Sequence, residues 1–407
     1  MSNLTKYVAV ISGCVIIASA VLRADDWPQW RGPNRDAKVA NFKVPAAWPT
    51  TLTAKWKTTV GTGDSTPALV KDKLFAFGRQ GADEVTTCLD AATGKELWSD
   101  KYAAPAVTGA AARHPGPRSS PEVADGHVIT LGVSGILSCL NADTGKMEWR
   151  KDDIKTFPQY FVGMSPIVVD GLVIAHLGAR GSGALEAFDL KTGDVKWKWA
   201  ADGPGYASPV VLTVEGVKQI VTMTEANIVG ISAADGKLLW QTPFAVTGMA
   251  YNAATPIVDG ATVIFTGQNR GTTAVKIEKS GDAFKATQLW KNATVSTQFN
   301  TPVLKDGLLY GLSDKGTLFC IKASDGTTAW TDSTARGGNF AAIVDAGSVL
   351  FALPSNSQLI AFKPSDKAFD QVANIKVSTA ATYAYPVIDG NKIYIRDDTS
   401  VSLLVVE

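Results

Sequence analysis

The sequence is poor in the residues that build metal and redox sites. Its 407 residues include only three histidines and four cysteines. No CxxC or CxxCH motif is present, and no GxSxG, P-loop or GxGxxG motif stands in a suitable context. His127 and His176 fall within apolar runs typical of strands, so we expect structural roles for both. The sequence therefore predicts neither a metal site nor a bound cofactor, and an enzymatic role is not favoured.

An excess of charge is also missing. Lysine and arginine total 39, and aspartate and glutamate total 38, which gives a net charge of +1. Such a balance provides no basic surface for the phosphates of nucleic acid or for anionic lipid. The chain also contains no charge block, low-complexity tract or long linker. We therefore expect no nucleic-acid partner, and we expect a monomer.

The N-terminus differs from the rest of the chain. Residues 7–22 are almost wholly apolar, follow Lys6 and lead to the small residue Ala24. This order is typical of a secretory signal peptide over residues 1–24, whereas a retained anchor would need about 20 apolar residues to span a membrane. Cys14 resembles a lipid-attachment cysteine, but the apolar run continues beyond it, which disfavours lipid anchoring. We expect cleavage, export to the periplasm or cell envelope, and no transmembrane span afterwards.

What the sequence has in abundance is internal repetition. The segment LDAATGKELW, Leu89–Trp98, recurs at intervals of about 40 to 51 residues, and a copy near Val372 has lost its tryptophan. Ahead of each copy lies an apolar run, an Asp-Gly-type turn and a second apolar run, which is a hairpin pattern that occurs eight times. The tryptophans that hold the motif position are Trp56, Trp98, Trp149, Trp197, Trp240, Trp290 and Trp330.

One repeat corresponds to four antiparallel strands in roughly 45 residues, which is the size of a propeller blade. The last block, residues 385–406, supplies only three strands, and the missing one is the segment 54–59 around Trp56. The sequence therefore predicts an all-β fold: a single eight-bladed β-propeller over residues 54–407, whose last blade is closed by the N-terminal strand. Residues 25–53 are expected to form an N-terminal arm packed on the propeller, with binding of a partner as the alternative.

Each part of the repeated motif suits a structural task. Glycine can adopt the positive φ of a tight turn, and tryptophan brings a large apolar area and one N–H donor to the gap between blades. A site would be expected once per protein rather than in five to seven copies, so we interpret these residues as structural. The turn glycines are Gly94, Gly145, Gly193, Gly236 and Gly326.

The three cysteines beyond the leader occupy one position of the repeat. Cys88, Cys139 and Cys320 take a slot that Ala187 holds in another copy, which indicates a small core position. Neighbouring blades pack about 10 Å apart, which exceeds the reach of a disulfide. We predict three buried free thiols.

On these repeats the chain resembles the PQQ-like, quinoprotein-type eight-bladed β-propellers, and it is similar to the outer-membrane assembly factors called BamB. The segment DWPQWRGPNRD, Asp26–Asp36, also resembles a start found in PQQ-repeat proteins of environmental bacteria. Quinone-dependent alcohol dehydrogenases of this fold carry adjacent cysteines, a tryptophan beneath the quinone and a calcium site with a catalytic aspartate. None of these features carries over, so the resemblance implies no bound PQQ.

Propellers usually bind their ligands at the axial funnel, where the loops ahead of the innermost strands meet. In this chain the loops before the Ser/Thr-Pro blocks are rich in aromatic residues, and one of them carries Arg113 and His114. Such a surface suits a peptide, a sugar or a flat anion through stacking and ion pairing. The alternative is that these aromatics only fill the channel. The candidate residues are Asp64, Arg113, His114, Arg118, Tyr160, Tyr206, Tyr251, Asn252, Phe299, Asn300, Phe340 and Tyr383.

The favoured function is a non-enzymatic binding or scaffold propeller of the bacterial cell envelope, whose partner is an envelope protein, a peptide or a glycan. The alternatives are a PQQ-dependent oxidoreductase-like enzyme and a carbohydrate-binding propeller.

Overall fold

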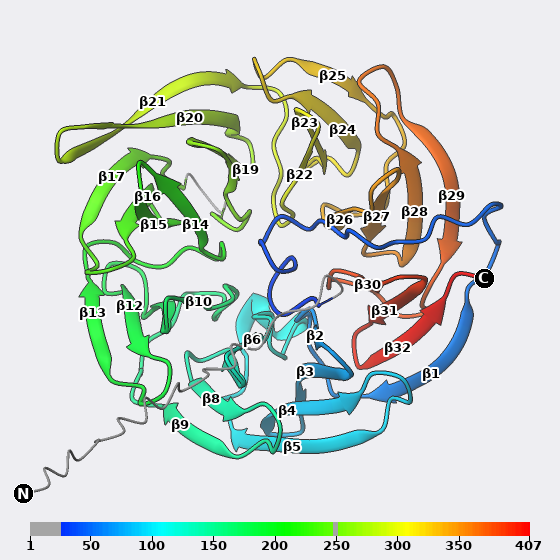
Figure 1. Cartoon of the computed structure of the whole chain (residues 1–407), viewed down its shortest axis with the longest axis horizontal. Helices are drawn as coiled ribbons and strands as arrows, with labels where there is room; N and C mark the ends of the chain where they lie inside the picture. Colours follow the sequence, from blue (N-terminus) through cyan, green and yellow to red (C-terminus); the bar gives the residue numbers. More distant parts are fainter. Residues whose placement is uncertain (1–25, 247–250) are drawn as a thin grey trace, which may run out of the picture.

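Eight four-stranded antiparallel sheets surround a common axis in the computed structural model, which describes residues 26–246 and 251–407 (Figure 1). The prediction of an all-β, eight-bladed propeller is confirmed. The predicted leader (1–24), its cleavage position Ala24 and the lipid-attachment candidate Cys14 lie outside the described residues. A short 3₁₀ helix, η1 (Gly109–Arg113), precedes the second blade.

Each blade runs from a short inner strand to an outer strand at the rim. Blades 1 to 4 consist of β2 (Ala68–Val70), β3 (Lys73–Gln80), β4 (Asp83–Asp90) and β5 (Glu96–Ala103); β6 (Glu122–Ala124), β7 (His127–Leu131), β8 (Leu137–Asn141) and β9 (Met147–Lys151); β10 (Ile167–Val169), β11 (Leu172–Leu177), β12 (Ala184–Asp189) and β13 (Val195–Trp199); β14 (Val210–Val214), β15 (Val217–Met223), β16 (Asn227–Ser232) and β17 (Leu238–Pro243).

Blades 5 to 8 follow the same order, and the last of them takes its outer strand from the start of the chain. They consist of β18 (Ile257–Asp259), β19 (Thr262–Gly267), β20 (Gly271–Ser280) and β21 (Ala283–Asn292); β22 (Val303–Lys305), β23 (Leu308–Leu312), β24 (Leu318–Lys322) and β25 (Thr328–Thr331); β26 (Ala341–Asp345), β27 (Leu350–Pro354), β28 (Gln358–Lys363) and β29 (Asp370–Lys376); β30 (Val387–Asp389), β31 (Lys392–Arg396), β32 (Ser400–Val405) and β1 (Thr53–Thr59).

The ring is closed by the pairing of the two ends of the chain. Strand β1 runs antiparallel to β32, with Thr53 opposite Val405 and Trp56 opposite Leu403. The prediction that the N-terminal strand completes the last blade is therefore confirmed. Closure leaves no blade without a neighbour on either side, so each can bury both faces.

The repeated tryptophans fasten each blade to the next. The Trp149 indole N–H donates to the Leu190 carbonyl at 2.8 Å, and its ring lies under the turn glycine Gly193, where a Cβ atom would approach it to 2.8 Å. Gly193 has φ +71, a conformation that glycine adopts without strain. Trp240 departs from this pattern, because its N–H donates to the side chain of Gln219 in its own blade.

The N-terminal arm, residues 26–52, crosses the axis on one face of the ring (Figure 1). This face carries the turns that follow the inner strands, and we call it the turn face. The arm pairs Trp27 with Leu69 and Lys38 with Asp345, which lie in blades 1 and 7. Trp27 is 2% exposed. The arm is thus packed across several blades.

Two buried arginines anchor the arm to the inner strands. Arg35 forms an ion pair of 2.6 Å with Glu122 and donates to the Pro209 carbonyl at 2.9 Å. Arg31 donates to the Pro302 carbonyl at 2.9 Å and lies against the Tyr385 ring. These prolines belong to the Ser/Thr-Pro blocks, so the arm satisfies carbonyl groups of several blades at once.

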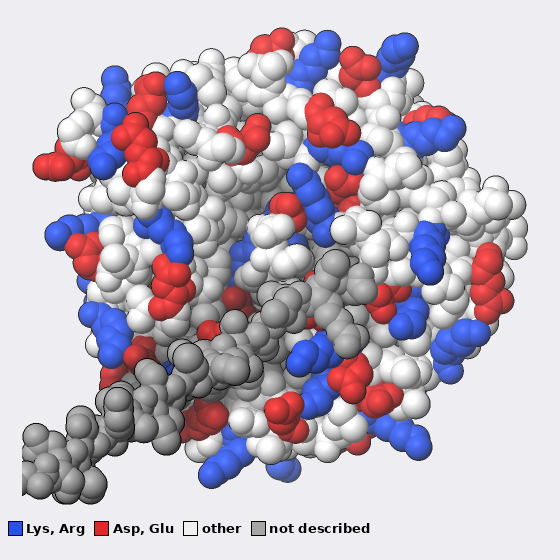
Figure 2. Space-filling view, viewed as in Figure 1, with Lys and Arg blue, Asp and Glu red and all other residues white. Residues whose placement is uncertain are grey.

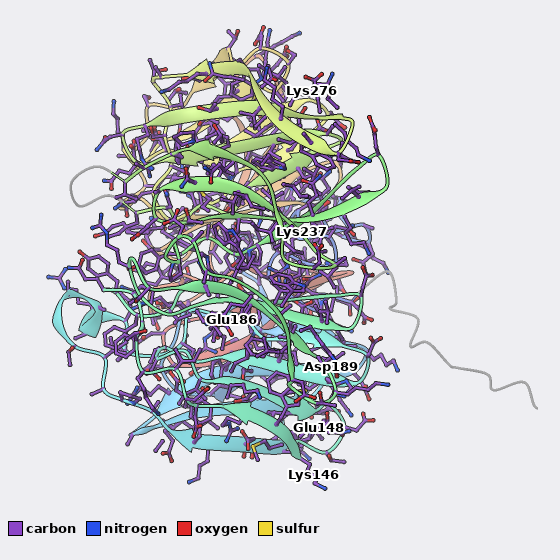
Figure 3. The ribbon with its side chains drawn as sticks, turned by 90° about the vertical axis from the view of Figure 1, so that its left-hand side faces the viewer. Lys146, Glu148, Glu186, Asp189, Lys237 and Lys276 are labelled. Atoms are coloured by element: carbon purple, nitrogen blue, oxygen red, sulfur yellow. The ribbon has the colours of Figure 1, made fainter. Side chains whose placement is uncertain are left out.

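Charges of both signs are interspersed over the visible surface of the turn face (Figure 2). The rim shows the same mixture in the edge-on view of Figure 3, where the labelled residues are Lys146, Glu148, Glu186, Asp189, Lys237 and Lys276. Many of these charges are paired, such as Lys198 with Glu186 at 2.9 Å and Lys196 with Asp189 at 3.3 Å. Among the described residues, no helix is long and apolar enough to span a membrane.

Candidate functional site

The loops that precede the innermost strands meet on the face opposite the arm, which we call the loop face. Every blade contributes at least one of the predicted residues to this face, because each inner strand begins there. The aromatic candidates make ring contacts with one another, and they fall into two clusters joined by Arg118.

The tyrosine cluster comprises Tyr160, Tyr206, Tyr251 and Phe299. The Tyr251 ring lies edge-on to Tyr160 at 4.9 Å and to Tyr206 at 6.0 Å, and it stacks with Phe299 at 5.7 Å. The Tyr206 hydroxyl accepts a hydrogen bond of 3.2 Å from the Tyr160 backbone N–H. Phe299 is 43% exposed, so the cluster offers an apolar aromatic surface to solvent.

The histidine cluster comprises Asp64, His114, Phe340 and Tyr383. The Nδ1 atom of His114 lies 2.8 Å from the Asp64 carboxylate, and its ring lies edge-on to Tyr383 at 4.8 Å. Tyr383 in turn contacts Phe340 at 5.4 Å. In this cluster two aromatic rings lie beside an aspartate and a histidine.

Arg118 connects the two clusters on one side. Its guanidinium donates to the His114 carbonyl at 3.1 Å and to the Tyr160 carbonyl. On the other side, between blades 6 and 7, the Asn300 amide donates to the Asn339 carbonyl at 3.4 Å. The members of the two clusters are thus linked around the axis by hydrogen bonds and ring contacts.

Two predicted residues are buried beneath this surface, and a third makes none of the contacts that link it. Asn252 is buried and donates to the Thr224 carbonyl at 2.7 Å, while Asn300 is buried and donates to the Leu312 carbonyl at 2.9 Å. Their amides satisfy backbone groups beneath the face, as buried polar groups must. Arg113 ends η1, is exposed, and takes part in none of the ring contacts described above.

Two arginines that were not predicted hold the loops in place. Arg396 donates to the carbonyls of Gly61 and Gly63 at 3.1 and 2.9 Å, which positions the loop that bears Asp64. Arg270 donates to the Tyr251 carbonyl at 3.0 Å. Burial lowers the pKa of each to about 10. In the sequence, Arg396 directly follows the apolar run Ile393–Ile395, and a charged residue at the end of a buried strand is the signal that could have identified it.

The electrostatics of the face follow from its hydrogen bonds. The bond to the Asp64 carboxylate raises the pKa of His114, although burial opposes it. The bond between the Tyr251 and Tyr160 side chains raises the pKa of Tyr251 to about 12, and burial raises that of Tyr206. Tyr251 and Tyr206 are therefore neutral hydrogen-bonding groups at neutral pH. Such a face can stack apolar or aromatic groups beside a small charged patch.

Two hollows of the molecule are lined by other residues and lie on the turn face. One, of about 510 Å³, is lined by turns of blades 5 to 7, including Asp259, Asp306 and Asp366. The other, of about 440 Å³, lies between the arm at Arg35 and the inner strands of blades 3 and 4. Neither is lined by a predicted candidate residue.

Comparison with known proteins shows a family match over most of the chain. Residues 46–208 and 81–332 match the family described as outer membrane protein assembly factor BamB. A BamB of Yersinia pestis is 25% identical over 363 residues, which are 84% of this chain and 86% of that protein.

Solved structures share the fold. The BamB of Moraxella catarrhalis has a TM-score of 0.64 at 15% identity and covers 88% of this chain and 98% of its own. A quinohemoprotein alcohol dehydrogenase from Comamonas testosteroni has a TM-score of 0.69 at 14% identity and covers 94% and 80%. At these identities the likeness concerns architecture alone, which both proteins have in common with this chain.

Proposed function

The chain belongs to the family described as outer membrane protein assembly factor BamB, and on that premise we propose that it is a non-enzymatic scaffold of the bacterial cell envelope that binds an envelope protein through its loop face. The observation that carries this proposal is the linked set of aromatic side chains on loops from consecutive blades. Aromatic and arginine side chains are the groups that most often anchor protein interfaces.

The form of the face favours a segment of protein chain as the partner. Phe299 and Tyr251 stack and leave apolar surface exposed, whereas Asp64, His114 and Arg118, on the loops of other blades, offer charge and hydrogen bonds. An extended peptide can place an apolar side chain on the first group and a polar one on the second. The periplasm is the compartment that we propose, with a monomer as the working unit and without a bound cofactor.

Substitution of the exposed aromatics tests this proposal. The variant Tyr251→Ala/Phe299→Ala should keep the melting temperature of the wild type within a few degrees and should lose most of the partner captured by cross-linking in envelope extracts. The matched control is Leu97→Ala/Leu289→Ala, which removes two side chains that are each 51% exposed on the outer strands. Equal capture by both variants and the wild type would contradict a role for the loop face.

A second measurement addresses the oxidoreductase alternative. The purified chain is mixed with PQQ, calcium and an alcohol, and reduction of an electron-accepting dye is followed. We expect no reduction above that of the quinone alone. Turnover that depends on the protein would overturn the assignment as a non-enzymatic scaffold.

A further inference from the structure

A β-bulge lies at the same position of the outer strand in every blade, directly before the residue that pairs with the small-residue slot. In blade 2, Cys139 lies opposite Trp149 and Leu140 lies opposite Met147, so Glu148 is the additional residue. A bulge of this kind re-aims a side chain that regular alternation would point to the other face. The residues that hold this bulge position in blades 1 to 8 are Leu97, Glu148, Lys196, Leu239, Leu289, Ala329, Val372 and Lys55.

Blade 2 alone combines three metal-binding side chains at this place. Cys139 on β8 occupies the small-residue slot, and Glu148 on β9 is the bulge residue. Cys139 pairs with Ile129 on β7, and His127 lies two residues before Ile129 on that strand. Blade 1 also has a cysteine in the slot, but there the corresponding residues are Lys73 and Leu97. The other cysteine blade, blade 6, has two apolar residues instead, Leu308 and Ala329.

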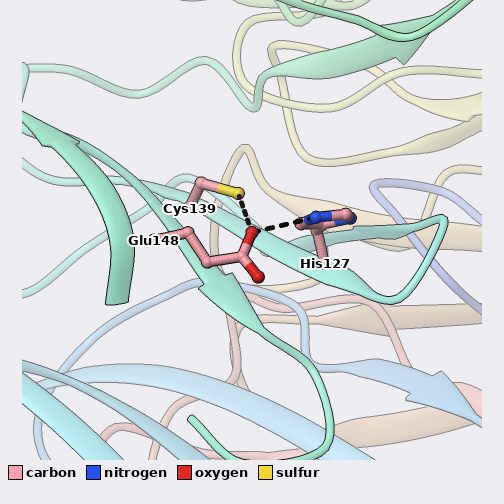
Figure 4. A group of neighbouring side chains, drawn as sticks. All are labelled: His127, Cys139 and Glu148. Carbon is pink, nitrogen blue, oxygen red and sulfur yellow. Dashed lines mark hydrogen bonds and ion pairs between the residues drawn. The ribbon is translucent and has the colours of Figure 1, made fainter. Parts of the chain in front are cut away.

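The donor atoms of the three side chains point toward one another (Figure 4). The His127 Nε2 atom lies 2.9 Å from the Glu148 carboxylate, and the Cys139 sulfur lies 3.7 Å from the same oxygen. Within the described part of the chain, this is the one group of three or more such side chains whose donor atoms all lie within 4.8 Å of one another. Around a tetrahedral zinc ion, such donors lie roughly 3.3–3.6 Å apart, so small side-chain movements suffice.

Binding of a metal at Cys139 requires the thiol to release its proton to solvent as the metal–sulfur bond forms. Burial raises the pKa of Cys139, so without a metal the sulfur is a neutral S–H that faces the Leu190 carbonyl at 3.5 Å. A metal ion displaces that proton, because the thiolate is the ligand form. The Leu190 carbonyl would still accept the Trp149 indole N–H at 2.8 Å, so loss of the S–H leaves no buried acceptor without a partner.

We propose that His127, Cys139 and Glu148 bind a zinc ion through Nε2, Sγ and a carboxylate oxygen, with the fourth position open to solvent. The set of one imidazole, one thiolate and one carboxylate matches the ligands that zinc accepts, whereas calcium and magnesium prefer oxygen alone. Glu148 retains 27% side-chain exposure and His127 14%, which provides an entry path from the rim, while the sulfur lies beneath them. This site is separate from the loop face.

Binding of Zn²⁺ and Co²⁺ to the untagged full chain, stripped with a chelator, tests the proposal. Titration calorimetry should give one Zn²⁺ per chain with release of a proton. Co²⁺ should produce the near-ultraviolet charge-transfer band of a thiolate ligand and the visible bands of four-coordinate cobalt. Cys139→Ala, Glu148→Leu and His127→Leu should each weaken Zn²⁺ binding by at least about tenfold, because each removes a ligand.

The replacements are residues that this chain already places at the same positions in other blades, so the variants should fold. Cys88→Ala is the matched control: it removes a cysteine from the same slot in blade 1 and should leave both the affinity and the cobalt spectrum unchanged. Absence of a thiolate band, failure to bind Zn²⁺ at micromolar concentration, or equal weakening by Cys88→Ala would each overturn the proposed site.

Discussion

The turn face and the loop face belong to the same eight blades but differ in how closely their connections agree. On the turn face, the same glycine recurs at positive φ against the tryptophan ring of the preceding blade, for example Gly145 against Trp98 and Gly193 against Trp149. On the loop face, the equivalent positions range from Asp64 to Gly163 to Tyr206. Repeated residues therefore perform the packing that every blade needs, and residues that differ between blades are free to form a binding surface.

The arm complicates this contrast, because it is unique in the sequence and yet serves packing. It lies on the turn face, where Arg31 and Arg35 donate to carbonyl groups of separate blades. A non-repeated segment thus stabilises a repeated scaffold, and it does so through buried charge rather than through the motif.

The largest effect is expected from Arg35→Ala, which tests whether the arm is part of the fold. Removal of one partner of the buried Arg35–Glu122 pair leaves an uncompensated carboxyl and should lower the free energy of unfolding by about 3–5 kcal/mol. Urea denaturation measures the loss. The control is Lys38→Ala, whose side chain is 47% exposed and should matter little. Equal free energies of unfolding for the two variants would show that the arm contributes little to the stability of the propeller.

The next largest effect tests the packing of the repeated tryptophans between neighbouring blades. Trp149→Ala should lower the free energy of unfolding by about 3–4 kcal/mol, because a large buried ring and its hydrogen bond to Leu190 are lost. Trp98 is only half-buried, so Trp98→Ala should cost less. Thermal unfolding followed by tryptophan fluorescence or calorimetry ranks the two, and an unchanged melting temperature for Trp149→Ala would count against the fastening role.

The smallest effect concerns the loop face and depends on pH. Because the folded pKa of His114 is raised by Asp64, the pair contributes stability fully below about pH 6.5, the unfolded value, and loses it as pH rises through the folded pKa. Solvent screens this half-buried pair, so we expect about 0.5 kcal/mol between pH 6 and pH 9. An NMR titration of the His114 imidazole, with Asp64→Asn as control, measures the pKa directly. A value at or below that of a free histidine would disprove the pairing.

The sequence predicted the blades well because their residues obey local rules. The hairpin pattern, the turn glycines and the tryptophan spacing repeat often enough to indicate strand order, blade number and closure by residues 54–59. The three thiols at Cys88, Cys139 and Cys320 are buried and free, as the small-residue slot predicted. These inferences required only the alternation of strands and the comparison of one repeat with the next.

The sites were harder to predict, since their residues come together from separate segments. The position three residues before each Ser/Thr-Pro proline, or before the equivalent Ile343, identified Tyr206, Phe299, Phe340 and Tyr383. It could not tell that Asn252 and Asn300 turn inward to backbone carbonyls. The group of His127, Cys139 and Glu148 was missed for a similar reason. Its members lie on three strands, and only the bulge in β9 turns Glu148 toward the other two.

The sequence by itself determined the architecture, because a pattern of period two, repeated eight times with the same turn chemistry, has few other ways to bury its apolar residues. The tertiary structure alone decided which polar side chains meet. Arg35 pairs with Glu122, His114 with Asp64, and His127 with Glu148. No local sequence pattern predicts these pairs, because their members lie on separate strands or loops. Strand pairing, bulges and ring closure bring these groups within a few ångströms of one another. At that distance they form ion pairs and charge-assisted hydrogen bonds.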